Sequence, residues 1–216
     1  YHVPCEKTRD QVKYLTKKPI DVFPFWSNQN IWYPIEDKKS LREKYGIPES
    51  SYLIGSFQRD TEGSDLTSPK LEKGPDLFCD YIKKINRKNI HVLLGGWRRQ
   101  YVISRLKESK IPFTYFELAD LQKLRQMYCS LDLYVISSRY EGGPQSALEA
   151  SGMKVPIIST DVGMVSEILH PSSIFDSLDE NFYPDQDIVK FNFEQVSRFE
   201  IKSHKENYIK MFKCVI

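Results

Sequence analysis

The chain has 216 residues, a hydrophobic content of 40% and a formal net charge of +2 at pH 7. A chain of this length can bury about 70% of its unfolded surface, so it needs no disulfide framework. The balanced charge argues against a nucleic-acid binder that depends on overall charge, and no apolar run approaches the ~18 residues of a membrane span. The cysteines are far apart and form no C-x2-C pair, which argues against a zinc or redox site. We therefore expect a cytoplasmic globular protein.

Buried-strand patterns alternate with amphipathic helices along most of the chain. Short apolar runs rich in β-branched and aromatic residues mark the strands, and apolar residues three or four apart mark the helices. In chain order, we expect helix 8–15, strand 20–25, helix 40–46, strand 51–57, helix 76–85, strand 90–94, helix 98–109, strand 111–116, helix 120–129, strand 132–136, helix 144–151, strand 155–158, strand 173–175 and helix 195–212. Ser40 is the expected N-cap of its helix, and 61–72 is an expected loop. The alternation predicts an α/β fold, a Rossmann-like parallel sheet with helices on both faces.

The most informative stretch is a glycine turn between a predicted strand and a predicted helix. Gly142 and Gly143 allow a sharp turn and a close approach of a ligand to the backbone. Pro144 fits the first helical position, where a missing N–H group costs nothing. The free N–H groups of Gln145 and Ser146 would then point out of the helix start, at a spot that favours an anion.

Two carboxylates flank this predicted anion site, Glu141 in the turn and Glu149 inside the helix. The combination makes sense for a ligand with an anionic part for the amides and a hydroxyl-rich part for the carboxylates. A nucleotide-sugar has both parts. The alternative is that Glu141 is a solvated loop residue and Glu149 faces water, and the residues alone leave both interpretations open.

Glu141 and Glu149 have seven residues between them, and the segment resembles the Glu-x7-Glu signature of retaining GT-B glycosyltransferases, the group 1 family. The resemblance continues without a gap to Ile168. It implies one half of a GT-B fold, with 1–35 as lead-in and linker from a missing N-terminal domain and 36–216 as the donor-binding domain. It also implies a nucleotide-diphosphate sugar as donor, a sugar, lipid-linked or polysaccharide acceptor, and no essential metal or other cofactor. Any membrane contact would come through the missing domain.

The resemblance assigns roles to the carboxylates and to the base-binding loop. Glu141 would hold hydroxyls of the donor sugar and stabilise positive charge at its reacting carbon. Glu149 would bind the ribose hydroxyls. Glu117 and Leu118, after the strand 111–116, would meet the nucleobase through backbone groups.

The cationic side of the implied site consists of Arg59 and Lys73, which would contact the donor diphosphate. Thirteen residues separate them, more than is usual in the family, so Lys70 could replace Lys73. Arg59, Gly95, Glu117 and Glu141 each follow a predicted strand, so a parallel sheet would gather them at one edge.

Two further functions remain open at this point. The chain could be a noncatalytic sugar-nucleotide-binding subunit or scaffold that needs a separate acceptor-binding chain. A sugar-nucleotide epimerase shares the two-domain architecture, although it lacks the Glu-x7-Glu pattern. We favour a glycosyltransferase of glycan or polysaccharide biosynthesis, and we expect these residues alone to be inactive.

Overall fold

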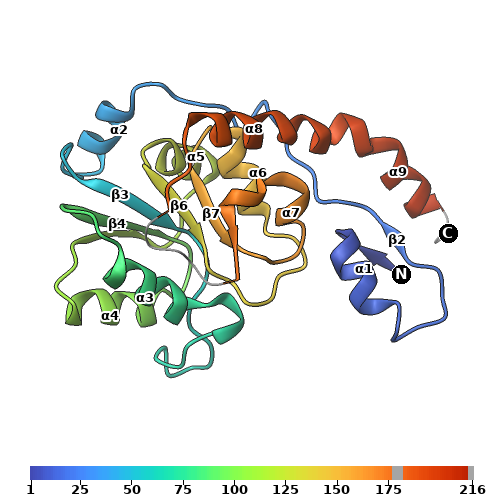
Figure 1. Cartoon of the computed structure of the whole chain (residues 1–216), viewed down its shortest axis with the longest axis horizontal. Coiled ribbons are helices and arrows are strands. Elements are labelled where there is room, and N and C mark those ends of the chain that lie inside the picture. Colours follow the sequence, from blue (N-terminus) through green and yellow to red (C-terminus); the bar gives the residue numbers. More distant parts are fainter. Residues whose placement is uncertain (177–181, 214–216) are drawn as a thin grey trace.

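The structure is a computed structural model that describes residues 1–176 and 182–213. Its main body is a six-stranded parallel sheet with the strand order β5-β4-β3-β6-β7-β8 (Figure 1). A two-stranded parallel sheet, β1-β2, lies beside it. The strands are β1 (His2–Val3), β2 (Asp21–Val22), β3 (Tyr52–Ser56), β4 (Ile90–Gly95), β5 (Phe113–Phe116), β6 (Leu133–Ile136), β7 (Ile157–Thr160) and β8 (Ile174–Phe175).

Helices cover both faces of the six-stranded sheet, with α3 and α4 on one side and α5, α6 and α8 on the other (Figure 1). Alternation along the strands builds the two cores: Val92 and Leu94 pack toward α3 and α4, whereas Leu93 packs toward α5 and α6. The described helices are α1 (Glu6–Val12), α2 (Lys38–Lys44), η1 (Leu71–Lys73), α3 (Pro75–Lys84), α4 (Gln100–Glu108), α5 (Leu121–Cys129), α6 (Gln145–Gly152), α7 (Val165–Ile168), η2 (Pro171–Ser173), α8 (Gln186–Val196), η3 (Ser197–Phe199) and α9 (Ile201–Lys213). The predicted α/β class and Rossmann-like sheet are confirmed.

The strand order reverses between β3 and β6. The chain runs outward from β3 through β4 to β5, then returns to place β6 on the free side of β3, where Ile54 pairs with Leu133. In such sheets, ligands bind outside the carboxyl ends of the strands, at the point where the order reverses. The loops after β3 and β6 are therefore where a site is expected.

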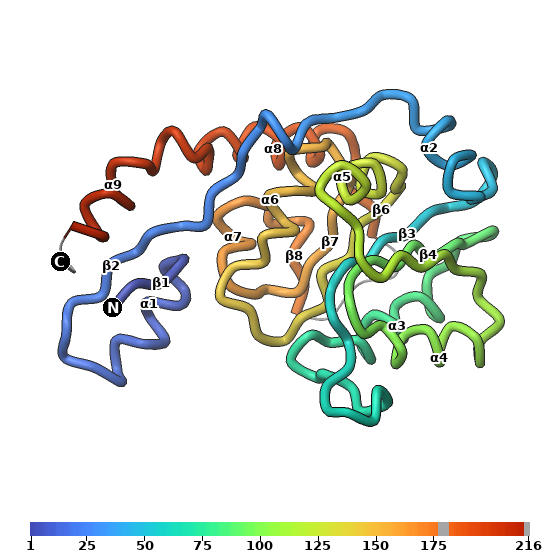
Figure 2. Tube along the Cα trace, turned by 180° about the vertical axis from the view of Figure 1, so that it is seen from behind, coloured from blue at the N-terminus to red at the C-terminus, as the bar shows by residue number. Residues whose placement is uncertain are grey.

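The N-terminal residues form a small unit of β1, α1 and β2 beside the sheet (Figure 2). Helix α9 extends from the main body toward this unit, and the Tyr208 hydroxyl donates to the carbonyl oxygen of Pro24 at 2.9 Å. Further along, Trp32 is buried and its ring meets Tyr128 edge-on.

Several predicted boundaries are wrong for local reasons. The N-cap of α2 is Asp37, not Ser40, because the Asp37 carboxylate accepts from the Ser40 amide and hydroxyl. Pro144 has an extended ψ of 104°, so α6 begins one residue later. The final helix, predicted over 195–212, is α9, which begins later, at Ile201. Helix α8 was not predicted, and Asp185 caps it by accepting from the amide of Ile188.

Smaller elements also differ from the prediction. Strand β7 lies two residues later than predicted, η1 closes the expected loop, and the short strand β1 was not predicted. Cys5, Cys79 and Cys129 are buried and free, whereas Cys214 lies outside the described residues. Within the described ranges, none of the helices combines the length and apolar character that a membrane crossing requires.

Candidate functional site

Lys73 and Glu141 meet at the carboxyl end of β6. The Lys73 ammonium donates to Glu141 Oε1 at 2.5 Å, and the two side chains are 26% and 15% exposed. Lys73 ends η1, whereas Glu141 lies in the turn that follows β6. The structure therefore brings together the cation expected at the donor diphosphate and the carboxylate expected at the donor sugar.

Backbone contacts hold the two loops of this ion pair together. The carbonyl oxygen of Glu72 accepts from the amides of Arg139 and Tyr140 at 2.8 and 3.1 Å. Gly74 has a φ of +59°, and a Cβ atom there would lie 1.8 Å from the carbonyl oxygen of Ser137. Only glycine fits such a left-handed position in direct contact with another backbone. The spacing of cation and carboxylate is thus fixed by main-chain packing.

Gln58 and Ser138 complete the surroundings of the ion pair, and neither was predicted from the sequence. The Gln58 amide donates to the carbonyl oxygen of Lys73 at 2.5 Å. The buried Ser138 hydroxyl lies 3.0 Å from Glu141 Oε1 and 3.2 Å from Gln58 Oε1, so its single proton serves one of two acceptors. Their positions in the sequence could have indicated them as site residues, because each follows the end of a strand that flanks the reversal of strand order.

A cleft of about 400 Å³ opens over the ion pair. Residues from the N-terminal unit form its opposite wall, and Lys7 is anchored there by an ion pair of 2.7 Å to Asp161. Lys70 also lines the cleft and pairs with Glu72 at 2.9 Å. The polar side chains of the lining are those of Lys7, Thr8, Gln11, Lys70, Glu72, Lys73, Arg139, Tyr140, Glu141 and Asp161.

Glu149 lies in α6 and is half-buried. The Tyr128 hydroxyl donates to Glu149 Oε2 at 2.9 Å, and burial raises the pKa of Glu149 from 4.5 to about 6 despite this hydrogen bond. The Tyr128 ring stacks edge-on against Phe57, with centroids 4.7 Å apart. Phe57 directly precedes Gln58, so Tyr128 and Phe57 connect Glu149 to the loop that contacts the ion pair. The Glu149 side chain itself does not line the cleft of 400 Å³.

Arg59 follows β3, but its side chain turns away from the ion pair. Its Nε donates to the carbonyl oxygen of Thr61 at 2.7 Å, and its guanidinium lies 5.3 Å from the centroid of the Trp97 ring. The structure thus places Arg59 at the expected edge of the sheet without bringing its guanidinium to Lys73. Glu117 and Leu118 are both exposed after β5, and Leu118 is 82% exposed.

The glycine turn lies between β6 and α6 as predicted, although neither Gly142 nor Gly143 has a positive φ. Gly142 lines the cleft, and Gly143 has no room for a side chain because a Cβ atom there would lie 2.9 Å from the sulfur of Met164. The Gln145 side chain donates to the carbonyl oxygen of Trp26 at 2.7 Å. The Ser146 side chain hydrogen-bonds with that of Tyr134.

A buried ion pair fixes the neighbouring strand ends, and it too was not predicted. Arg99 is 1% exposed and its Nε lies 2.7 Å from Asp60 Oδ2. The same guanidinium donates to the carbonyl oxygens of Ser56 and Gly95, which end β3 and β4. No group of three or more His, Cys, Asp or Glu residues that could hold a metal ion occurs in the described part of the chain.

Comparison with known proteins decides the family. The model of "Glycosyl transferases group 1" matches residues 65–181, a range that contains Lys73, Glu141 and Glu149 but not Arg59. The chain belongs to the group 1 glycosyltransferases. The resemblance stated from the Glu-x7-Glu segment is therefore confirmed.

Individual relatives of this group 1 domain are distant. The O-antigen biosynthesis glycosyltransferase WbnH of Escherichia coli is 26% identical over 156 residues, which are 70% of this chain and 44% of that protein. A structure of HepE from Anabaena, in complex with UDP and glucose, covers 99% of this chain and 62% of its own with a TM-score of 0.80 and 11% identity. The C-terminal domain of LpcC from Francisella tularensis covers 84% and 98%, with a TM-score of 0.56 and 20% identity.

These structural similarities establish the fold alone. The chain spans less than half of the length of the curated relatives it matches, from 33% to 44%. The activities of these full-length relatives therefore do not transfer directly to this chain.

Proposed function

We propose that this chain is the donor-binding, C-terminal domain of a retaining glycosyltransferase. It would bind a nucleotide-diphosphate sugar whose sugar is transferred to an acceptor hydroxyl, in glycan or polysaccharide biosynthesis. The observation that carries the proposal is the Lys73–Glu141 pair of 2.5 Å beside the reversal of strand order. In this pair, Lys73, which could bind a diphosphate, lies directly beside Glu141, which could bind the hydroxyl groups of a sugar. The structure of HepE with UDP and glucose supports this class of donor.

The departing diphosphate needs its charge neutralised as the bond to the sugar breaks. Lys73 would exchange Glu141 for a phosphate oxygen, and the amides of Gln145 and Ser146 at the start of α6 would donate to the same group. Preorganised donors of this kind are worth roughly 3–4 kcal/mol each in enzymes where one has been deleted. We propose that these groups suffice without an essential metal, so nucleotide binding should be equal in EDTA and in magnesium.

Release from Lys73 would free Glu141 for the donor sugar. Its carboxylate could then hold sugar hydroxyls and stabilise positive charge at the reacting carbon, and the Ser138 hydroxyl at 3.0 Å would keep it in place. The acceptor hydroxyl would attack from the face that the nucleotide leaves, which retains the configuration.

The nucleoside would extend toward β3, β4 and β5. Glu149 would accept from the ribose hydroxyls, and backbone groups of Glu117 and Leu118 would meet the base. Gly142 and Gly143 would let the ligand approach the main chain. Arg59 would contact the diphosphate after its guanidinium leaves the ring of Trp97, which lies 5.3 Å away.

The partners in this proposal are the donor, an acceptor sugar, lipid-linked sugar or polysaccharide, and an N-terminal GT-B domain. Residues 1–35 would be the lead-in and linker from that domain, and 36–216 the donor-binding domain. We propose a cytoplasmic location, with any membrane contact made through the N-terminal domain.

Isothermal titration of the chain with UDP, GDP, ADP and their sugar conjugates tests the proposal. One nucleotide series should bind, and Lys73→Ala and Glu149→Ala should each weaken that binding. The matched control is Lys39→Ala, which removes a 71% exposed lysine that does not line the cleft. The proposal fails if no series binds, or if Lys73→Ala and Glu149→Ala both bind as tightly as the parent.

A further inference from the structure

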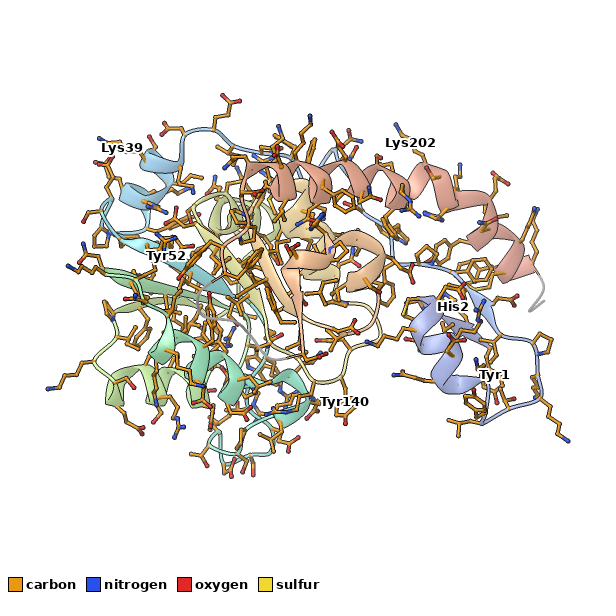
Figure 3. All side chains as sticks on the ribbon, viewed as in Figure 1. Tyr1, His2, Lys39, Tyr52, Tyr140 and Lys202 are labelled. Carbon is orange, nitrogen blue, oxygen red and sulfur yellow. The ribbon has the colours of Figure 1, made fainter. Side chains whose placement is uncertain are left out.

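A second cavity, of about 530 Å³, adjoins the cleft of the Lys73–Glu141 pair. The two share Lys7, Arg139, Tyr140 and Asp161 as lining residues, so they are compartments of one groove. Tyr140 lies on the side of the sheet body that faces the N-terminal unit (Figure 3). The proposed function above assigns no ligand to this second compartment.

The two cations that line the second compartment are each paired with a carboxylate. Lys7 lies 2.7 Å from Asp161, and Arg139 lies 2.6 Å from Asp76. Asp176 adds a further carboxylate to the lining. This compartment therefore carries no excess of positive charge that would hold a phosphate, but it offers both hydrogen-bond donors and acceptors. Hydroxyl groups, which donate and accept, suit such a lining better than an anion does.

An aromatic ring stands beside these polar groups. Tyr140 is 74% exposed, and its backbone amide is fixed by the carbonyl oxygen of Glu72 at 3.1 Å. An exposed aromatic ring on an anchored stretch of backbone, beside charged groups, suits the apolar face of a sugar ring, whose hydroxyl edge can reach those groups.

The position of the compartment relates it to the reaction. Ser138 lines it and also donates toward Glu141 Oε1 at 3.0 Å. A ring stacked on Tyr140 would thus lie next to the proposed reacting carbon without occupying the place of the diphosphate at Lys73. We infer that the second compartment binds a neutral sugar ring of the acceptor, with Tyr140 as its stacking surface and Asp161 and Lys7 as hydroxyl ligands. This inference rests on the proposed function.

Saturation-transfer NMR of the whole chain tests the inference, with methyl α-glucopyranoside and methyl α-mannopyranoside as probes. Transfer to the ring protons of at least one glycoside should persist when a nucleoside diphosphate saturates the protein. Tyr140→Ala should lower the transfer about fivefold, as expected for loss of an aromatic contact, and Tyr140→Phe should keep it. Tyr14→Ala is the matched control, because Tyr14 is 82% exposed and lines neither compartment.

Other outcomes would overturn the inference. The absence of transfer to both glycosides, or an unchanged signal in Tyr140→Ala, would show that the compartment binds no sugar ring. Loss of the signal on addition of the nucleotide would place the glycoside at the donor sugar's position. Displacement of the glycoside by inorganic phosphate would show an anion site. The proposed function fails separately, if no nucleotide binds while the glycoside signal follows Tyr140.

Discussion

Neutralising Glu141 should tighten the binding of a nucleoside diphosphate. Lys73 is held by Glu141 at 2.5 Å, with side chains 26% and 15% exposed, so a diphosphate must displace a carboxylate to reach this lysine. Exposed ion pairs contribute about 0.2–1 kcal/mol, and hydrogen bonds to charged groups about 1.5–3 kcal/mol. A partly buried pair lies between these limits, at about 1 kcal/mol. Since about 1.4 kcal/mol corresponds to a tenfold change, Glu141→Gln should raise the affinity about fivefold.

Isothermal titration with the nucleoside diphosphate that binds the parent measures this gain. The gain should shrink in high salt, because ions screen the competition between carboxylate and phosphate for the lysine. Glu49→Gln is the control, since it removes the same charge from a 64% exposed side chain, paired with Lys39, that does not line the cleft. An affinity of Glu141→Gln that equals or falls below that of the parent would refute the exchange of Lys73 between Glu141 and phosphate.

Three further predictions concern the same site. Lys73→Ala should lower nucleoside-diphosphate affinity by about tenfold in isothermal titration, and Lys70→Ala by less; the reverse order would assign the phosphate contact to Lys70. Burial raises the pKa of Glu149 in the folded chain from 4.5 to about 6. Protonated Glu149 therefore favours the folded chain fully below pH 4.5, and this contribution to stability is lost as the pH rises through 6. Glu149→Gln should therefore raise the free energy of unfolding by up to about 2 kcal/mol at pH 7.5 but not at pH 4, as measured by urea denaturation. Gly74→Ala should destabilise the chain by about 1–3 kcal/mol in the same assay, because its Cβ atom would lie 1.8 Å from a carbonyl oxygen. Gly63→Ala, at a similar φ of +70° but 3.5 Å from its nearest neighbour, should cost less.

The sheet could be predicted from the sequence because each strand carries its own local pattern. Runs of buried residues such as those of β4 and β6 show where the strands lie, and the parallel arrangement follows from the helices between them. Helix boundaries were less accurate where a cap decided them. Asp37 accepts from a backbone amide in the first turn of α2 and moves the start of that helix from the predicted position. Asp185 does the same in α8, a helix that was not predicted.

The site could be predicted only in part, for a related reason. Glu141 could be placed in the turn after a predicted strand, and the resemblance to the family indicated Lys73; the fold brings the two to 2.5 Å. The direction of a side chain depends on neighbours from distant segments. Arg59 turns toward Trp97, and Lys7 reaches the cleft from the N-terminal unit, whose position beside the sheet was not predicted.

The role of Glu149 is open to a sharper test than loss of binding alone. A carboxylate that served only the structure should stabilise the folded chain, and its replacement should cost stability at neutral pH. Burial instead raises the pKa of Glu149 to about 6, so keeping it ionised above that pH works against folding. Tyr128, which donates at 2.9 Å, would serve a glutamine oxygen as well. The presence of a carboxylate that lowers the stability of the folded chain is explained if a ligand hydroxyl donates to it. Glu149→Gln should thus stabilise the chain at pH 7.5 and weaken nucleotide binding, and a variant that lost stability with binding intact would show a structural role.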